Sequence, residues 1–478
     1  MDLSRKPKTG LLYIAAERFM ELGKDTRDGT YAERKIAECR TYAHRIRPFS
    51  DVCESGIVNT REQAEKAVEK FHHEGVDCVV AIFLSWSEDY HWITFLKKLS
   101  PEIPLMLASV VRDGINITDT HDENQFIDFL SAGALVGFLE GSGSFKRFGK
   151  PNYFLEIDTL DNLAEKIHVF SKAAMVRAVL SKTTIGLLAC YNEAMFATYT
   201  DPYNAYMKIG ARLRFLSVAD LCSEIEAIPD FETEEVLSKL YSAYKIHPNV
   251  ERDKFFASVR ATLAMEKLAT DNNADLLVLN DIDTTLFRQV GLRPGFTPLD
   301  GNKNRVTVPE GDIGGGLATY ILRILSQRVA NFIEPFYINN SNGTFAAGHA
   351  GPNDYTECPE NVIIARDERF AKSQWKYAGA PFAWYVFPEG EKTMLHMSEE
   401  NGKMKMIATL VECVPTKHYL ASYSHADFRH KTLSHTELFK AIAEKGATQH
   451  FAICPGNVTE ELKALAKMMD FDYYFIGE

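Results

Sequence analysis

Apolar positions are spaced along the first part of the chain in two ways, and each spacing predicts one type of element. Short apolar runs at 10–16, 77–84 and 103–109 have the length of buried parallel strands. The segment 60–72 instead repeats its apolar positions with a helical period. Strands separated by helices predict a parallel sheet with helices on both faces, so we expect an α/β domain here.

The same alternation of predicted strands and helices begins again near residue 182. A fresh strand is predicted at 184–189, and a helix at 255–270 leads into a buried strand at 274–280. A turn-rich stretch follows, and a helix is expected over 313–327 with its apolar positions on one face. This pattern predicts a second parallel-sheet unit.

After about residue 330 the segments become short and strand-like, divided by Pro, Gly and charged turns. The predicted strands are 362–366, 382–387, 404–411 and 419–423, and a strand–helix–strand run over 451–476 closes the chain. We therefore expect an α/β protein with two Rossmann-like parallel-sheet domains, 1–180 and 181–330, and a β-rich C-terminal domain, 331–478.

Composition narrows the class of protein. The chain has 478 residues and a net charge of −12, which argues against nucleic acid or an anionic membrane as partner. No run of about twenty apolar residues suggests a membrane span, and the N-terminal segment lacks the apolar core of a signal peptide. The eight cysteines contain no CxxC pair, which fits reduced thiols in the cytoplasm.

Four side chains with ligand chemistry lie in the second half of the chain. Glu310 falls in the run Val-Pro-Glu-Gly-Asp-Ile-Gly-Gly-Gly (308–316), and Glu334 begins a new apolar run. His349 lies in the Gly-flanked turn Ala-Ala-Gly-His-Ala-Gly-Pro, and His450 precedes a predicted strand. Two carboxylates and two imidazoles can bind a divalent metal of the manganese type and leave positions for water or substrate. We expect the C-terminal domain to complete this metal site.

The order of these motifs resembles the L-arabinose isomerase family, within a wider group that includes the L-fucose isomerases. The similarity is densest over 303–352 and 441–476, and weaker over 80–96. It implies that Glu310, Glu334, His349 and His450 bind Mn²⁺, or Co²⁺ or Mg²⁺ in its place. It also implies a homohexamer in which the N-terminal domain covers a neighbour's metal site.

The resemblance also implies a reaction, the interconversion of an aldose and a ketose through an enediol. Such a reaction moves a proton between C1 and C2, and a Lewis acid stabilises the charge that develops on the oxygens. One of Glu310 and Glu334 would remove the carbon-bound proton, and the other would move the hydroxyl proton. The expected substrate is a free pentose or deoxyhexose.

The chain departs from the family pattern around the sugar. The family's double His is Gln449-His450 here, its Gln–His pair after the first strand is replaced within 15–18, and a His from a neighbouring subunit is replaced within 134–137. We therefore expect altered sugar preference. The candidate sugar contacts are Glu17, Arg18, Trp92 and Gln449.

Each candidate also has an ordinary interpretation. Glu310 could be an acid favoured by a helix N-terminus, and His349 could cap a turn. Asp281 and Asp283 are expected to cap a loop or to support the ligands from behind. A set of three histidines is expected on surface loops: His425, His430 and His435.

Two other functions remain open on the same residues. One is an L-fucose or D-arabinose type of isomerase activity, and the other is a sugar-binding protein without catalysis. Retention of both candidate carboxylates favours an enzyme, because a binding module has no use for two carboxylates on one metal.

Overall fold

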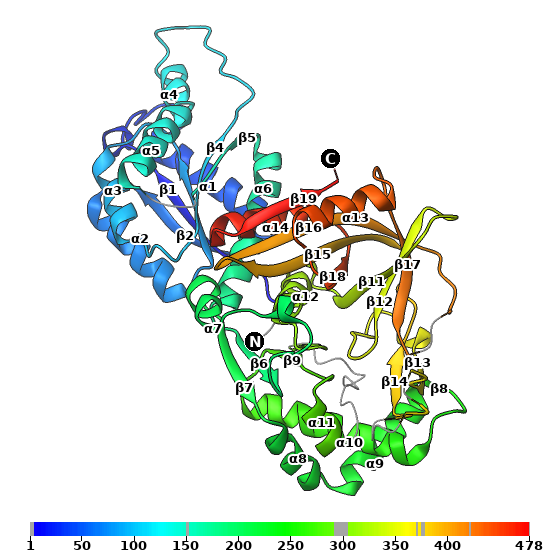
Figure 1. Ribbon diagram of the computed structural model, residues 1–478. Coiled ribbons are helices and arrows are strands. Elements are labelled where there is room, and N and C mark those ends of the chain that lie inside the picture. Colours follow the sequence, from blue (N-terminus) through cyan, green and yellow to red (C-terminus); the bar gives the residue numbers. More distant parts are fainter. Residues whose placement is uncertain are drawn as a thin grey trace. The chain divides into compact units, whose positions relative to one another are not determined.

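The computed structural model describes residues 4–149, 153–290, 305–369, 371–373, 378–419 and 422–477 (Figure 1). Its internal contacts divide the chain into two compact units. One unit comprises 5–178 and 460–470, and the other is built mainly from 179–459. The regions 181–330 and 331–459, which the sequence suggested as parts of separate domains, lie within the second unit.

The first unit contains a parallel sheet with the strand order β2-β1-β3-β4-β5. This is a doubly wound order. The chain adds β2 on one side of β1 and then β3, β4 and β5 on the other, so the strand order switches between β1 and β3. The strands are β1 (Lys8–Ile14), β2 (Asp51–Val58), β3 (Cys78–Phe83), β4 (Leu105–Val110) and β5 (Phe154–Asp158). The strands expected at 10–16, 77–84 and 103–109 are confirmed as β1, β3 and β4.

Helices alternate with these strands. They are the 3₁₀ turn η1 (Glu17–Phe19) and α1 (Tyr31–Ile46), α2 (Arg61–Glu74), α3 (Asp89–Lys98), α4 (Glu123–Ser131), α5 (Ala134–Phe148) and α6 (Leu160–Leu180). The sequence sets the starts of α1 and α2, because Thr30 with Glu33 and Thr60 with Gln63 form reciprocal capping boxes. The helix expected at 60–72 is confirmed as α2.

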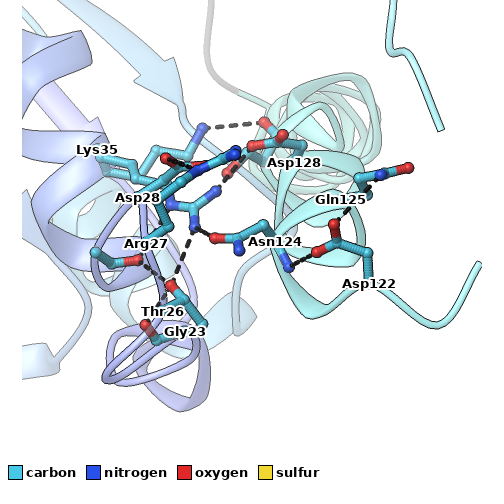
Figure 2. Close-up of polar contacts among 12 residues, drawn as sticks. Gly23, Thr26, Arg27, Asp28, Lys35, Asp122, Asn124, Gln125 and Asp128 are labelled. Atoms are coloured by element: carbon cyan, nitrogen blue, oxygen red, sulfur yellow. Dashed lines mark hydrogen bonds and ion pairs between the residues drawn. The ribbon is translucent and has the colours of Figure 1, made fainter. Parts of the chain in front are cut away.

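Polar side chains join α1 to α4 (Figure 2). Arg34 on α1 donates hydrogen bonds to Asp128 (2.9 Å) and to the Asn124 side chain (2.8 Å) on α4. Asp122 caps α4 by accepting from the backbone N–H of Asn124 at 2.8 Å. These contacts hold α4 against α1.

A buried lysine beside this junction provides a test of the unit's stability. The Lys35 side chain is fully buried, and its Nζ donates to Glu38 at 2.8 Å and to the Ser131 carbonyl at 3.0 Å. Glu38→Gln leaves this ammonium without its counter-charge, so it should destabilise the unit by about 3–5 kcal/mol. Thermal unfolding would measure the loss.

The matched control is Glu235→Gln, which removes an exposed partner of Lys239. Exposed pairs contribute about 0–1 kcal/mol, so this change should be nearly silent. Equal effects of the two substitutions would show that burial of Lys35 does not govern the cost.

One helical stretch, Glu123–Phe148, is long and apolar enough to cross a membrane by length and composition alone. The sequence analysis did not expect such a segment. A third of its most apolar window is buried inside the protein. A single helix of this kind is weak evidence for a membrane span, because core helices of soluble proteins also pass this test.

The second unit begins with a smaller parallel sheet of order β10-β9-β6-β7. Its strands are β6 (Thr184–Leu188), β7 (Arg212–Leu216), β9 (Leu276–Leu279) and β10 (Val306–Val308). Its helical segments are η2 (Phe196–Thr198), α7 (Pro202–Asn204), η3 (Ala205–Ile209), α8 (Val218–Ala227), α9 (Asp230–Ala243), α10 (Arg252–Asp271), α11 (Thr284–Gln289) and α12 (Ile313–Ser326). The predicted strands at 184–189 and 274–280 and the predicted helices at 255–270 and 313–327 are confirmed.

The β-rich region forms a closed barrel. The antiparallel order β15-β18-β11-β12-β17-β16 closes because β15 also pairs with β16, and β19 adds to β16 in parallel. The strands are β11 (Asn331–Asn339), β12 (Thr344–His349), β15 (Gly390–Glu400), β16 (Lys403–Val414), β17 (Ser424–His430), β18 (Phe451–Pro455) and β19 (Asp472–Ile476). The expected α/β class with a β-rich C-terminal region is confirmed.

Smaller elements complete this region. A second sheet joins β8 (Lys245–Ile246), β13 (Ile363–Arg366) and β14 (Pro381–Trp384), and η4 (Pro359–Asn361) and α13 (His435–Glu444) are short helices. The last helix, α14 (Thr459–Met469), belongs almost entirely to the first unit. The strands expected at 362–366 and 382–387 correspond to β13 and β14. The strand expected at 419–423 includes 420–421, which lie outside the described residues, and β17 begins after it at Ser424.

Helix α12 is the buried link between the parallel sheet and the barrel. It contacts β9 and β10 on one side and β11, β15 and β18 on the other (Figure 1). Almost every residue from Ile313 to Leu325 is buried, so its apolar surface is not limited to the one face that the sequence suggested. At its start Gly315 lies so close to Phe332 and Asp312 that a Cβ would collide with the Phe332 ring. The glycine run therefore serves close packing.

Candidate metal centre

The first candidate ligand, Glu310, lies in the turn between β10 and α12. Its side chain is 14% exposed, and its backbone has a φ of 62°. Two residues later, Asp312 is the N-cap of α12 and accepts from the Gly315 N–H at 2.9 Å. The turn thus presents two carboxylates at the buried start of one helix.

His450 stands just before β18 and is fully buried. Its Nδ1 donates to Asp312 Oδ2 at 2.8 Å, and its Nε2 lies 3.1 Å from Glu310 Oε2. The buried His396 donates from Nδ1 to the His450 carbonyl at 2.8 Å. Burial lowers the pKa of His450, but Asp312 and Glu310 more than offset it and raise this pKa to about 9. The Asp312 bond orients the ring so that Nε2 faces Glu310.

His349 ends β12 and faces Glu310 from another side. Its Nδ1 donates to the Ala350 carbonyl at 2.7 Å, which leaves the lone pair on Nε2. Nε2 is buried without a hydrogen-bond partner among the described residues, and it lies 3.6 Å from Glu310 Oε1. Burial lowers the pKa of His349, although Glu310 and Glu334 oppose this shift. The neutral ring is the form that binds a metal.

Glu310, His349 and His450 together are arranged to hold a metal ion. Each offers one ligand atom, and these atoms lie within 4.8 Å of one another. The unpartnered Nε2 of His349 and the nearby carboxylate are the kind of donors that a divalent transition metal takes. The Phe332 ring contacts both imidazoles, with ring centroids 5.0 Å from His349 and 4.6 Å from His450. The residues therefore fit a metal, and the geometry does not identify which one.

Glu334 is adjacent to this trio but does not belong to it. It lies on β11, where it pairs with Gly348 of β12, next to His349. It is half-buried and within electrostatic reach of His349. Among the described residues, none makes a hydrogen bond or ion pair with its carboxylate. The structure thus brings three of the four predicted ligands together and leaves the fourth carboxylate unengaged beside them.

The predicted sugar contacts occupy varied surroundings. In the same unit, Gln449 is exposed and its amide lies 3.1 Å from the sulfur of Met195. In the first unit, Arg18 pairs with Glu88 at 2.9 Å, and Glu17 is exposed beside it. Trp92 is 1% exposed in that unit's core and donates to the Gly141 carbonyl, so it has a packing role. Contact of these residues with a sugar stays a prediction.

Asp281 and Asp283 have distinct partners. Asp283 is the N-cap of α11 and accepts from the Leu286 N–H at 2.8 Å, so its expected capping role is confirmed. Asp281 is 1% exposed and accepts from the Glu310 N–H at 3.0 Å. It therefore supports a ligand from behind.

Asp312 and His396 were not predicted as part of the site. An Asp directly before a glycine-rich helix is a recognisable N-cap, and that signal could have identified Asp312. His396 has no comparable signal, because it is 54 positions from His450 in the sequence.

The fold and the site define an α/β protein with a closed barrel and a buried candidate metal centre. No model of a known protein family matches the chain, and no curated protein matches it either. The resemblance to the L-arabinose isomerases consequently depends on the motif residues alone.

Proposed function

We propose that the protein is a metal-dependent aldose–ketose isomerase that acts on a free pentose or deoxyhexose, with Mn²⁺ as the expected metal. The observation that carries this proposal is the buried group of Glu310, His349 and His450 with the unengaged Glu334 beside it. An isomerase of this type needs a site for a divalent cation and two carboxylates that exchange protons with the substrate.

The two carboxylates are suited to different parts of the reaction. A bound metal would supply Lewis-acid stabilisation of charge on the two substrate oxygens. Glu334 has no hydrogen-bond partner among the described residues, so it is free to accept the carbon-bound proton. Glu310, the other carboxylate, would move the hydroxyl proton of the substrate. Different surroundings allow one carboxylate to act as base while the other acts as acid.

The proposal has three finer features. The alternation of strands and helices suggests a Rossmann-like topology for both parallel sheets, the cysteine pattern suggests a cytoplasmic location, and the motif resemblance implies assembly as a homohexamer. Exposed apolar side chains on α4 and α5 supply a surface for self-association, among them Phe129, Leu135 and Val136. They border a groove of about 370 Å³. The mass of the assembled protein in solution tests the proposed homohexamer.

Turnover of an aldose panel is the direct test. The purified protein, loaded with Mn²⁺, is incubated with five- and six-carbon aldoses, and ketose formation is measured with and without chelator. Metal-dependent ketose formation supports the proposal, and the preferred sugar separates an L-arabinose from an L-fucose or D-arabinose type of activity. Sugar binding without any turnover would instead identify a binding protein.

Metal removal is expected to lower thermal stability. A ligand that binds only the folded state stabilises it by about 2.7 kcal/mol at a concentration one hundred times its dissociation constant. Mn²⁺ added to chelator-treated protein should therefore raise the melting temperature, as measured by scanning calorimetry. His349→Ala should abolish this rise, because it removes the unpartnered Nε2.

The matched control is His121→Ala, since the His121 side chain is 93% exposed and lies in the other unit. This variant should keep the whole Mn²⁺-dependent rise. An equal rise in the His349→Ala variant would place the metal elsewhere.

A further inference from the structure

Glu310 has a backbone conformation that residues other than glycine rarely adopt. Its φ is 62°, and that of the following Gly311 is 70°. For a residue with a Cβ this left-handed region is unfavourable, and it persists only where the surroundings hold it in place. The strained residue is also the carboxylate shared by both imidazoles of the candidate metal centre.

Two buried side chains hold the peptide groups on either side of Glu310. Asp281 Oδ1 accepts from the Glu310 N–H at 3.0 Å, and Asn192 Nδ2 donates to the Glu310 carbonyl at 2.8 Å. Asp281 is 1% exposed, and so is Asn192. The next N–H, from Gly311, donates to the Leu279 carbonyl at 3.1 Å. Both backbone groups of Glu310 and the N–H of Gly311 therefore have defined partners.

These two side chains come from the carboxyl ends of neighbouring strands. Asn192 follows β6 and Asp281 follows β9, and these two strands pair in parallel. Asn280 ties the two segments together, because its amide donates to the carbonyls of Cys190 (3.1 Å) and Tyr191 (3.4 Å). The rigid edge of the parallel sheet is thereby connected to the turn that carries Glu310.

Asp281 does not belong to the ligand group itself. The ligand atoms that lie within 4.8 Å of one another come from Glu310, His349 and His450 among the described residues. Asp281 Oδ2 instead faces the turn after His349, at 3.9 Å from the point where a Cβ on Gly351 would lie. Asp281 is therefore placed to orient the segments that carry two ligands.

We propose that Asp281 and Asn192 are positioning residues that hold Glu310 in its left-handed conformation and so direct its carboxylate toward His349 and His450. This inference rests on the proposed metal centre. It requires a hydrogen-bond acceptor at position 281 and a donor at position 192, and it requires a charge at neither.

Four variants separate these requirements: Asp281→Ala, Asp281→Asn, Asn192→Ala and Asn192→Asp. Mn²⁺ affinity is measured by calorimetry, and kcat and KM are measured separately. Loss of a residue that orients a metal ligand typically weakens metal binding about 10- to 100-fold, and we expect this of Asp281→Ala. Asp281→Asn should bind Mn²⁺ like the wild type, because its amide oxygen still accepts from the Glu310 N–H. Asn192→Asp should be at least as damaging as Asn192→Ala, because a carboxylate cannot donate to the Glu310 carbonyl.

A control in the same loop is Asp283→Ala. This substitution removes the cap of α11 and leaves the Glu310 contacts intact, so it should lower stability without changing Mn²⁺ affinity. The inference is overturned if Asp281→Asn loses as much affinity as Asp281→Ala, because the charge would then act directly. It is also overturned if Asp281→Ala and Asn192→Ala both bind Mn²⁺ like the wild type.

Crystal structures of the metal-free variants give a readout that needs neither metal nor activity. In Asp281→Ala, or in Asn192→Ala should the former not fold, the φ of Glu310 should leave the left-handed region. An unchanged φ in a folded variant would contradict the positioning role. If the wild type itself binds no Mn²⁺, the proposed metal centre is wrong. The φ of Glu310 in the variants still tests whether Asp281 and Asn192 hold its backbone.

Discussion

Replacing Glu310 by glutamine is expected to lower kcat roughly 10²- to 10⁴-fold, the range that a general acid or base usually contributes. Glutamine has nearly the same shape, so the turn and α12 should persist. The substitution removes the negative charge that lies 3.1 Å from His450 Nε2 and 3.6 Å from His349 Nε2. Turnover of the preferred aldose, measured at Mn²⁺ concentrations that saturate the variant, separates the loss of proton transfer from the weaker metal binding.

Glu412→Gln is the matched control for this experiment. Glu412 is an exposed residue of the barrel strand β16, so its loss should leave kcat, KM and Mn²⁺ affinity unchanged. A Glu310→Gln enzyme with wild-type kcat would remove Glu310 from proton transfer.

The second large effect is expected from Gly348→Ala. A Cβ at this position would collide with the Ser424 carbonyl oxygen and would lie 2.7 Å from the His425 Cα, both on the adjacent strand β17. Overpacked side chains usually cost about 1–3 kcal/mol, and this contact should exceed about 3 kcal/mol because backbone must move. Since His349 is the next residue, Mn²⁺ binding should weaken as well. Chemical denaturation and Mn²⁺ titration measure the two effects.

Gly143→Ala is the comparison for this substitution. Gly143 lies in α5, and a Cβ there would meet nothing within 4 Å. Alanine is the better helix former by about 1 kcal/mol, so this variant should be as stable as the wild type or slightly more stable. A Gly348→Ala protein of normal stability would mean that β12 and β17 can separate without cost.

The sequence predicted the parallel-sheet regions well because their signals are local. The largely apolar run at 77–84 and the helical period at 60–72 each lie within one element, and neither depends on distant partners. The barrel is different, since it includes pairs of distant residues such as Phe332 of β11 with Ala452 of β18. Pairing between residues so far apart leaves no pattern in a single segment, so only a β-rich region could be predicted.

Buried polar residues were the hardest to predict. The three histidines expected on surface loops are not on loops, so that expectation was wrong: His425 is fully buried on β17, His430 is the last residue of β17, and His435 is the first residue of α13. The segment Ser424–His430 reads as polar, and its burial follows from the closure of the barrel. The helix at 313–327 was predicted, but its burial on nearly all sides was not, because the sequence does not show that sheets cover it on both sides.

The part of the candidate site that could be predicted is the set of side chains whose residue type alone marks them as metal ligands. Glu310, His349 and His450 were singled out as ligands, and the fold brings them together. Of the groups that orient them, Asp281 was expected only as a loop cap or a support, and Asp312 was not singled out. The hydrogen bonds that the Glu310 N–H donates to Asp281 and His450 Nδ1 donates to Asp312 depend on three-dimensional proximity alone.

Because α12 is buried, the candidate metal centre at its start should stay intact only as long as the second unit stays folded. A helix that packs against the parallel sheet on one side and the barrel on the other cannot shift without disturbing both. Warming should therefore produce no partly active intermediate in which the site has loosened while the barrel persists. Inactivation and the global melting of this unit should coincide, and the amide protons of 317–325 should be among its last to exchange with solvent.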